Sequence, residues 1–188
     1  MSLLDILGFM PHFFHSQLLV TPAYPTEDCT GKTIIITGAN TGLGKEAARH
    51  YVRLNAERVI ITSRSADKGE AAKHDIEAST KRSGVVDVWS LDLLDYSSVK
   101  AFAKRAQGLK RVDAVIENAG MLTQTYKNVG GNETTITVNV VSTFLLALLL
   151  LPKLQEVSRT YSFTPTLTIV SSEVHQFSAL PERTHLHG

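Results

Sequence analysis

From Lys32 onward, short apolar segments alternate with longer segments of helical period, and this alternation constrains the fold more than any other feature. The apolar segments have no polar side, which is typical of parallel strands covered by helices on both faces. Five such strands are expected, within residues 33–37, 58–62, 85–90, 113–120 and 166–172. Helices are expected at residues 43–56, 66–79 and 97–107, with a long one within 133–151. The sequence therefore predicts an α/β fold, a doubly wound parallel sheet of about five strands.

Length, charge and cysteine content narrow the classes of function. The chain has 188 residues, enough for one domain with a sizeable core. Its 19 basic and 18 acidic residues leave a net charge of +1, so electrostatics favour neither nucleic acid nor an anionic membrane as a partner. Cys29 is the only cysteine, which excludes an internal disulfide and indicates a reducing, cytoplasmic compartment. A homo-oligomer is compatible with these properties.

The amino-terminal 20 residues are apolar but lack the features of a signal peptide or a membrane span. No lysine or arginine precedes the apolar stretch, Asp5 stands where that charge belongs, and Pro11, His12 and His15 interrupt it. An arm packed on its own domain is the favoured interpretation, and a membrane-peripheral interfacial anchor is the alternative. Residues 21–25 (TPAYP) are expected to be an extended linker, so residues 1–30 are assigned to an arm and linker.

The apolar run TFLLALLLL, residues 143–151, could be mistaken for a membrane span. It is shorter than the roughly 20 residues that a span requires, and it stops at Pro152 and Lys153. We expect a helix buried between the sheet and a neighbouring element.

The segment IIITGANTGLGKEAA, residues 34–48, places three glycines in the turn from the first strand into the first helix. In a doubly wound sheet this turn presents backbone N–H groups and a helix amino terminus to a pyrophosphate. Gly38, Gly42 and Gly44 would allow the sharp turn and leave room for the phosphates. A nucleoside-triphosphate loop is excluded, because residue 39 is Ala and Glu46 stands where Ser or Thr is required. The alternative is that the glycines only make a tight turn.

The residues after the second strand bear on the choice of dinucleotide. An acidic residue about 20 positions after the glycines would hydrogen-bond a free ribose 2′-hydroxyl. Ser63 and Arg64 stand there instead, and a guanidinium matches a phosphate in charge and geometry. Lys68, one helical turn on, could add a second positive charge. NADP(H) is therefore favoured over NAD(H), the alternative being that Arg64 is only a solvated loop cation.

Several segments together resemble the short-chain dehydrogenase/reductase family, and among its members the retinol-dehydrogenase-like and fungal reductases. TGANTGLG is similar to the T-G-x-x-x-G-x-G cofactor loop, LDLLDYSSV carries the family's Asp-Leu, and ENAG is similar to N-N-A-G with Glu117 replacing the first Asn. These segments keep the family's order over residues 31–172, which we assign to an NADP-binding Rossmann domain. The residues assigned to the cofactor are Gly38, Asn40, Thr41, Gly42, Leu43, Gly44, Ser63, Arg64, Lys68, Asp92, Leu93, Asn118, Ala119 and Gly120.

The resemblance also implies a mechanism, in which a hydride passes between the nicotinamide and a carbonyl or carbinol carbon. A tyrosine, assisted by a lysine four residues later, would transfer the proton. Ser172 would steady the substrate oxygen, and Asn139 would hold a water for proton relay. After Ser172 the sequence contains neither tyrosine nor lysine. A Y-x-x-x-K match at Tyr96 and Lys100 precedes the ENAG strand, and we expect it to be unrelated to the site.

The sequence therefore predicts a shortened member that lacks the family's last strands. Its fifth strand would be a sheet edge, its apolar helix flank within 144–151 would be exposed, and the chain would be inactive as it stands. Two functions stay open: an NADP(H)-dependent oxidoreductase acting on a small-molecule carbonyl or alcohol, or a non-catalytic domain binding dinucleotide or protein through its uncovered edge.

Residues 173–188, with His175, His185 and His187, are expected to be a frayed tail rather than a metal site.

Overall fold

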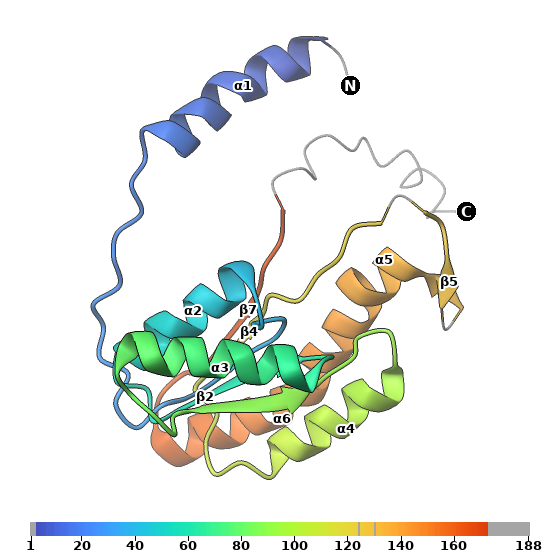
Figure 1. Ribbon diagram of the computed structural model, residues 1–188. Helices are drawn as coiled ribbons and strands as arrows, with labels where there is room; N and C mark the ends of the chain where they lie inside the picture. The colour runs from blue at the N-terminus through green and yellow to red at the C-terminus, as the bar shows by residue number, and fades with distance from the viewer. Residues whose placement is uncertain (1–2, 124, 130, 173–188) are drawn as a thin grey trace. The chain divides into compact units, whose positions relative to one another are not determined.

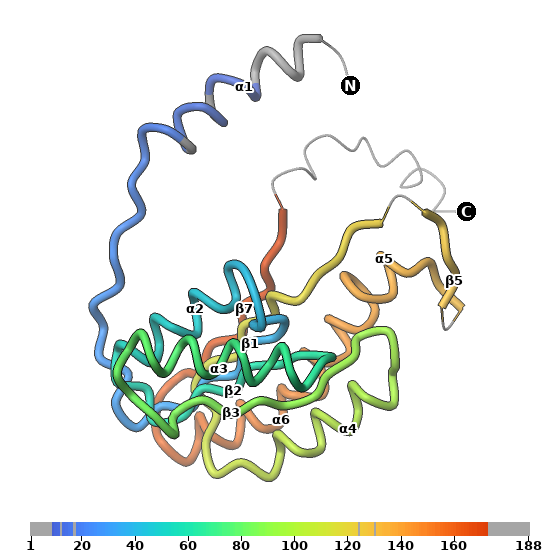
Figure 2. The backbone as a smooth tube through the Cα atoms, viewed as in Figure 1, coloured from blue at the N-terminus to red at the C-terminus, as the bar shows by residue number. Residues whose placement is uncertain are grey.

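The computed structural model describes residues 3–123, 125–129 and 131–172, which divide into two compact units. The larger unit is Thr26–Val170. The described part of the smaller unit consists of residues 3–25 and 171–172. The larger unit contains a sheet with helices on both faces (Figures 1 and 2).

A parallel sheet of five strands, in the order β3-β2-β1-β4-β7, forms the centre of the larger unit. Its strands are β1 (Thr33–Ile36), β2 (Arg58–Ser63), β3 (Val86–Ser90), β4 (Ala114–Glu117) and β7 (Thr166–Ile169). The chain moves outward from β1 to β3 and then returns to place β4 on the other side of β1. This order confirms the predicted doubly wound fold, and it places the expected ligand crevice at the carboxyl ends of β1 and β4.

Two helices cover each face of this sheet. They are α2 (Gly42–Arg53) and α3 (Ala66–Thr80) on one face, and α4 (Tyr96–Gln107) and α6 (Thr143–Tyr161) on the other. Successive strand residues alternate between the two faces, so Ile34 and Ile36 pack under α2 and α3 while Ile35 packs under α4 and α6. All three are at most 1% exposed. Burial on both faces is the reason that the strands are apolar throughout.

The helix predicted within residues 133–151 is longer than expected. It consists of α5 (Thr134–Ile136), a π-helical segment η1 (Thr137–Ser142) and α6, and it continues through Pro152 to Tyr161. The predicted end near Leu151 is wrong. Leu154 and Val157 beyond the proline are buried, and their packing offsets the hydrogen bond that Pro152 cannot donate.

By length and composition alone, the helix Thr134–Tyr161 is able to cross a membrane, with a mean hydropathy of 2.1 over its most apolar window. The expectation that this segment is too short rested on the nine-residue apolar run, whereas the whole helix has 28 residues. Core helices of globular proteins meet the same criterion, and 44% of the window is buried. Leu146 and Leu150 are almost fully buried, as expected for a helix packed on the sheet.

The β7 edge of the sheet and one side of α6 are incompletely covered. β7 is an edge strand in the described part of the chain, with Thr166 and Thr168 exposed. On α6, Phe144, Leu148 and Leu151 are 54%, 63% and 40% exposed, and we call these three residues the α6 stripe. Their spacing places them on one side of the helix. The sheet edge and the exposed flank both agree with the prediction.

Two elements, a hairpin and an amino-terminal helix, lie outside the expected strands and helices. A short hairpin, β5 (Asn128–Val129) and β6 (Asn132–Glu133), precedes α5. In the smaller unit, residues Leu3–Leu18 form the helix α1, which includes Pro11. Residues 20–25 have no regular structure, as expected for a linker. The predicted tail, residues 173–188, lies outside the described residues.

Candidate functional site

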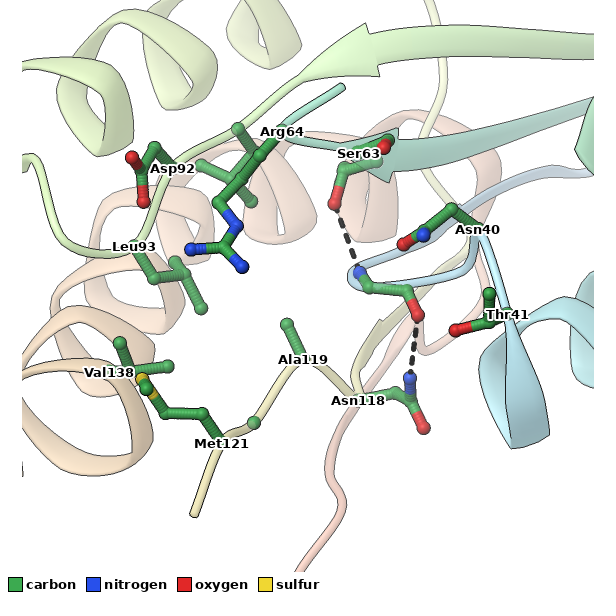
Figure 3. Close-up of a pocket in the computed structure, with 14 residues that line it drawn as sticks. Asn40, Thr41, Ser63, Arg64, Asp92, Leu93, Asn118, Ala119, Met121 and Val138 are labelled. Atoms are coloured by element: carbon green, nitrogen blue, oxygen red, sulfur yellow. Dashed lines mark hydrogen bonds between the residues drawn. The ribbon is translucent and has the colours of Figure 1, made fainter. Parts of the chain in front are cut away.

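A pocket of about 350 Å³ opens at the carboxyl ends of β1 to β4, where the topology places a crevice (Figure 3). The loop after each of these four strands contributes to its wall. The lining residues are Gly38, Asn40, Thr41, Thr62, Ser63, Arg64, Leu91, Asp92, Leu93, Asn118, Ala119, Gly120, Met121 and Val138.

Hydrogen bonds join the turn after β1 to the neighbouring strand ends. Thr37 Oγ1 accepts from the backbone N–H groups of Asn118 and Ala119, both at 3.0 Å. The Asn118 side-chain amide donates to the carbonyl oxygens of Thr37 and Gly38 at 3.1 and 3.3 Å. The Gly38 N–H donates to Thr62 Oγ1 at 3.1 Å (Figure 3). These bonds fix the ends of β1, β2 and β4 relative to one another.

Two of the three glycines lie where a side chain would collide with backbone. A Cβ at Gly38, whose φ is +64°, would lie 2.8 Å from Ala119 Cα. A Cβ at Gly44 would meet the Asn118 amide and would lie 3.0 Å from the Gly38 carbonyl oxygen. Gly42 has open space around it, and only its φ of +59° favours glycine. The loop therefore needs glycine for close packing as well as for backbone conformation.

Helix α2 begins at this turn with its first N–H groups available to a ligand. The residue before the helix, Thr41, lines the pocket, and within the described chain its side chain makes no capping hydrogen bond. The first turn of an α-helix has N–H groups without intrahelical partners and carries partial positive charge. The pocket thus has a built-in preference for an anion at this end.

Arg64 is the cationic side chain among the residues that line the pocket. It follows β2 directly, is exposed, and forms no ion pair with any residue that the structure describes. Its guanidinium extends into the pocket on the side of Asp92 and Leu93 (Figure 3). The neighbouring Ser63 is buried, and its hydroxyl donates to the Ser65 carbonyl oxygen at 2.8 Å. The rim after β2 therefore offers a charge that can pair with an anionic ligand.

The loop after β3 is fixed by short-range hydrogen bonds. The Asp92 N–H donates to Ser98 Oγ and the Asp92 carboxylate accepts from the Leu94 N–H, both at 3.0 Å. The Leu93 carbonyl oxygen accepts from Ser142 Oγ at 2.5 Å. Asp92 and Leu93 are thereby held at the pocket wall against η1.

Four of the residues assigned to a cofactor from the sequence do not line the pocket: Gly42, Leu43, Gly44 and Lys68. Leu43 is 80% exposed on the first turn of α2. Lys68 is exposed on the first turn of α3, where its backbone N–H donates to the Ser65 hydroxyl at 3.4 Å. Their assignments stay predictions. The other assigned residues are brought together in one pocket.

Asn139 lies in η1, and its side chain binds the loop that follows β4. Its Oδ1 accepts from the Met121 N–H at 2.9 Å, and its Nδ2 donates to the Met121 carbonyl oxygen at 2.7 Å. The side chain therefore holds a pocket-lining loop in place, while the implied role in holding a water stays a prediction. Ser172 is exposed and belongs to the smaller unit, so its implied role also stays a prediction.

Glu117, the last residue of β4, is a buried acid. It is 3% exposed, and its Oε1 has no hydrogen-bond partner among the described residues. Burial raises the pKa of Glu117 to about 8, because the charged carboxylate loses its hydration without gaining a partner. Glu117 is therefore protonated near neutral pH, and it directly precedes the pocket-lining Asn118.

The Y-x-x-x-K match lies away from the pocket lining. Tyr96 begins α4, and its hydroxyl accepts from Asn132 Nδ2 at 3.3 Å. Lys100 is exposed one turn later on the same helix. Neither residue lines the pocket.

Sequence reasoning missed several residues of the site: Thr37, Thr62, Leu91, Met121 and Val138. Thr37 and Thr62 carried a detectable signal, since each is a hydroxyl residue near the carboxyl end of an apolar strand. Val138 and Met121 come from segments brought together only by tertiary packing. Within the described residues, no group of three or more His, Cys, Asp or Glu side chains could hold a metal ion.

The fold and this pocket define a class of protein. A parallel doubly wound sheet that presents a glycine turn, a helix amino terminus and a cation at its switch point is a dinucleotide-binding domain of the Rossmann type. The short chain dehydrogenase family model matches residues 32–161. The chain therefore belongs to the short-chain dehydrogenase/reductase family.

Curated relatives agree with this assignment. The short chain dehydrogenase/reductase dmxR8 of Cryptosporiopsis sp. is 52% identical over 178 residues, which cover 94% of this chain and 55% of the relative. The short-chain dehydrogenase anuD of Penicillium roqueforti is 48% identical over 170 residues, covering 90% of this chain and 44% of the relative. The chain thus spans about half the length of these relatives.

Solved structures show the same fold. A short chain dehydrogenase of Escherichia coli CFT073, complexed with NADPH, is 30% identical, with a TM-score of 0.64 over 81% of this chain and 62% of that one. One from Shigella flexneri 2a, complexed with NADP, is 29% identical, with a TM-score of 0.64 over 80% of this chain and 62% of that one.

Proposed function

We propose that this chain forms the NADP(H)-binding part of an oxidoreductase that transfers a hydride between the nicotinamide and a carbonyl or alcohol carbon. Arg64 carries the proposal: it extends into the pocket without an acidic partner among the described residues, where an NAD-binding domain has an acid. The solved relatives complexed with NADP and NADPH support the same preference.

The residues present fit a dinucleotide. The glycine turn leaves open the space that a Cβ would fill, and the first N–H groups of α2 would bind the pyrophosphate. Arg64, with Ser63, would bind the 2′-phosphate, and Asp92 and Leu93 would contact the adenine region. Asn139 would keep the loop after β4 in place through Met121. When bound, the nicotinamide supplies or accepts the hydride.

We further propose that this stretch of chain binds the dinucleotide without turning over a substrate by itself. The tyrosine–lysine pair on α4 does not line the pocket, and Tyr96 is hydrogen-bonded to Asn132. A second candidate function, a non-catalytic domain that binds a protein partner or a second copy, is supported by the exposed edge of β7 and by the α6 stripe.

The preference for NADP(H) is tested by titrating the 188-residue chain with NADPH and NADH in a calorimeter. Arg64→Ala is expected to weaken NADPH binding about 10- to 100-fold and to leave NADH binding nearly unchanged, because only NADPH carries the 2′-phosphate. Lys104→Ala is the matched control, with an expected effect of less than about threefold, because Lys104 is an exposed cation on α4 that does not line the pocket. Equal weakening of both coenzymes by Arg64→Ala would contradict the assignment, as would NADPH binding no tighter than NADH binding.

Turnover is tested by following NADPH oxidation with aldehydes and ketones as substrates. We expect binding without oxidation by this chain. Oxidation that disappears in Tyr96→Phe would instead make the α4 pair catalytic.

A further inference from the structure

Helix α1 exposes large apolar side chains that the dinucleotide pocket does not use. Met10, Phe13, Phe14 and Leu18 are 37%, 36%, 49% and 74% exposed. At about 100° per residue, these four positions fall within an arc of about 140° on one side of the helix. Rings of Phe13 and Phe14 lie edge to face with centroids 5.9 Å apart, so the arc presents a continuous aromatic surface.

The apolar surface continues past the end of the helix. Leu19 and Val20 are 75% and 50% exposed, directly after Leu18. Side chains of three consecutive residues project in different directions, yet all three are exposed. A fluid apolar surface adapts to side chains that project in different directions more readily than a rigid groove does.

The charge of residues 1–25 and the length of α1 indicate what kind of apolar surface this segment binds. Asp5 is the only Asp, Glu, Lys or Arg in residues 1–25, so this segment has no basic residue to bind anionic lipid. The 16 residues of α1 extend about 24 Å, less than the roughly 30 Å of a bilayer's hydrocarbon core. An apolar helix too short to cross the hydrocarbon core is suited to lie along the interface.

We propose that α1, with Leu19 and Val20, is an interfacial anchor that binds the surface of a bilayer of zwitterionic lipid. The arc of Met10, Phe13, Phe14 and Leu18 enters the acyl-chain boundary, and His15, which is exposed outside that arc, stays on the water side. An arm packed on its own domain, the other interpretation that the sequence leaves open for this segment, would instead give no flotation. The proposal does not rest on the dinucleotide assignment.

The test is flotation of the 188-residue chain with phosphatidylcholine vesicles, comparing two neighbouring substitutions. Phe14→Glu places a carboxylate in the apolar arc and is expected to lower vesicle binding at least about tenfold, through the lost burial of the phenyl ring and the cost of dehydrating the charge. His15→Glu adds the same carboxylate one residue later, outside the arc, and is expected to keep binding within about twofold. Phosphatidylserine or added salt should change binding little.

Each contrary result would overturn the proposal. These results are no flotation of the unaltered chain, equal losses in the two variants, or binding that requires phosphatidylserine and disappears in salt. A lipid-free decrease in molecular mass caused by Phe14→Glu alone, measured by light scattering, would show that a second copy covers the arc. Far-UV circular dichroism and the thermal midpoint of both variants verify that the larger unit stays folded, and their unchanged NADPH affinity keeps this test separate from the proposed function.

Discussion

The two faces of the sheet are completed in different ways. On one face, α2 and α3 are joined by ion pairs and capping contacts in addition to their apolar core. On the other face, α4 and α6 share an apolar core, but α6 exposes its stripe and β7 is an edge. The same alternating strands supply both faces, so the difference arises from the helices.

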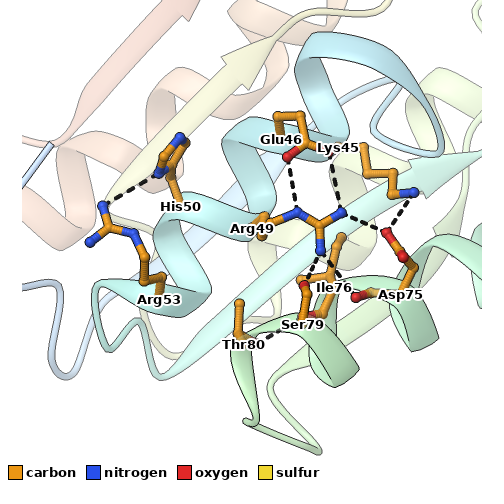
Figure 4. A network of polar contacts seen from close by, with 9 residues as sticks. All are labelled: Lys45, Glu46, Arg49, His50, Arg53, Asp75, Ile76, Ser79 and Thr80. Atoms are coloured by element: carbon orange, nitrogen blue, oxygen red, sulfur yellow. Dashed lines mark hydrogen bonds and ion pairs between the residues drawn. The ribbon is translucent and has the colours of Figure 1, made fainter. Parts of the chain in front are cut away.

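Polar contacts close the α2–α3 face (Figure 4). Arg49 on α2 pairs with Glu46 at 2.9 Å and with Asp75 of α3 at 2.5 Å, and Lys45 pairs with the same Asp75 carboxylate at 2.7 Å. Glu77 accepts from the N–H groups of Val85 and Val86 at the start of β3, each at 3.1 Å. These bonds connect consecutive elements and close this face over β1–β3, whereas Thr166 and Thr168 of β7, in register with Ala114 and Ile116, are exposed on it.

The α4–α6 face carries two unsatisfied features instead. Phe144, Leu148 and Leu151 present apolar area to water, and Glu117 is buried with no hydrogen-bond partner for Oε1 among the described residues. Exposed apolar patches of this kind mark surfaces where another element or another molecule packs. The pocket therefore lies beside a helix pair joined by ion pairs, while exposed apolar area remains on α6.

The largest expected effect separates the two sides of α6. Leu146→Ala should lower the free energy of unfolding by about 3 kcal/mol, because Leu146 is fully buried and its loss leaves a cavity. Leu148→Ala, the same substitution two residues later in the α6 stripe, should change it by less than about 0.5 kcal/mol. Urea unfolding followed by circular dichroism measures both values. Equal losses would mean that the α6 stripe is packed.

A smaller effect concerns the buried acid and its pH dependence. The pKa of Glu117 is raised to about 8 in the folded chain from 4.5, so the folded state binds the extra proton between these values. Stability should therefore fall as the pH rises from about 5 to about 8. Glu117→Gln should remove that decline and raise the free energy of unfolding at pH 8 by about 2 kcal/mol. Parallel stability–pH curves for the two chains would contradict this account.

The smallest expected effect concerns the α2–α3 face. Here stability falls as the pH is lowered, whereas the Glu117 effect lowers stability as the pH is raised. Lys45 and Arg49 lower the pKa of Asp75 to about 2 from 3.8, so its contribution is present above about pH 4 and is lost on acidification towards pH 2. Asp75→Asn should lower the thermal midpoint by a small and constant amount above about pH 4, and the difference should vanish towards pH 2. The loss should be smaller in high salt because the pair is exposed. Thermal midpoints between pH 2 and pH 8, at two salt concentrations, measure it. A difference as large at pH 2 as at pH 8 would show that the residue acts through packing.

Much of the fold was predictable because the central strands β1 and β2 are buried on both faces, which makes their apolar runs visible in the sequence. The rim of the pocket was predictable for a related reason. Gly38, Ser63, Asp92 and Asn118 follow or end strands, and parallel strands place their carboxyl ends on one side of the sheet. Whether these residues bind a dinucleotide remains a prediction.

The parts that sequence could not supply depend on contacts between distant segments. The helix end at Tyr161 was missed because Pro152 is a stop signal that burial of Leu154 and Val157 overrides. The protonation state of Glu117 depends on its burial. The replacement of the family's first Asn by Glu117 in ENAG does not reveal that burial. The hydrogen bonds between Asn139 and Met121 depend on η1, and no residue type in the sequence predicts its π-helical geometry.

The π-helical segment η1 also determines how this part of the chain responds to the deletion of a residue. η1 fits more residues into a turn than an α-helix does, and Thr143 Oγ1 donates to the Val138 carbonyl oxygen at 2.9 Å across it. The wider turn absorbs one extra residue, so deleting a single residue between 137 and 142 can restore α-helical turns while Leu146 and Leu150 keep facing the sheet. Deleting a residue from the regular part of α6 would instead rotate everything downstream by about 100° about the helix axis.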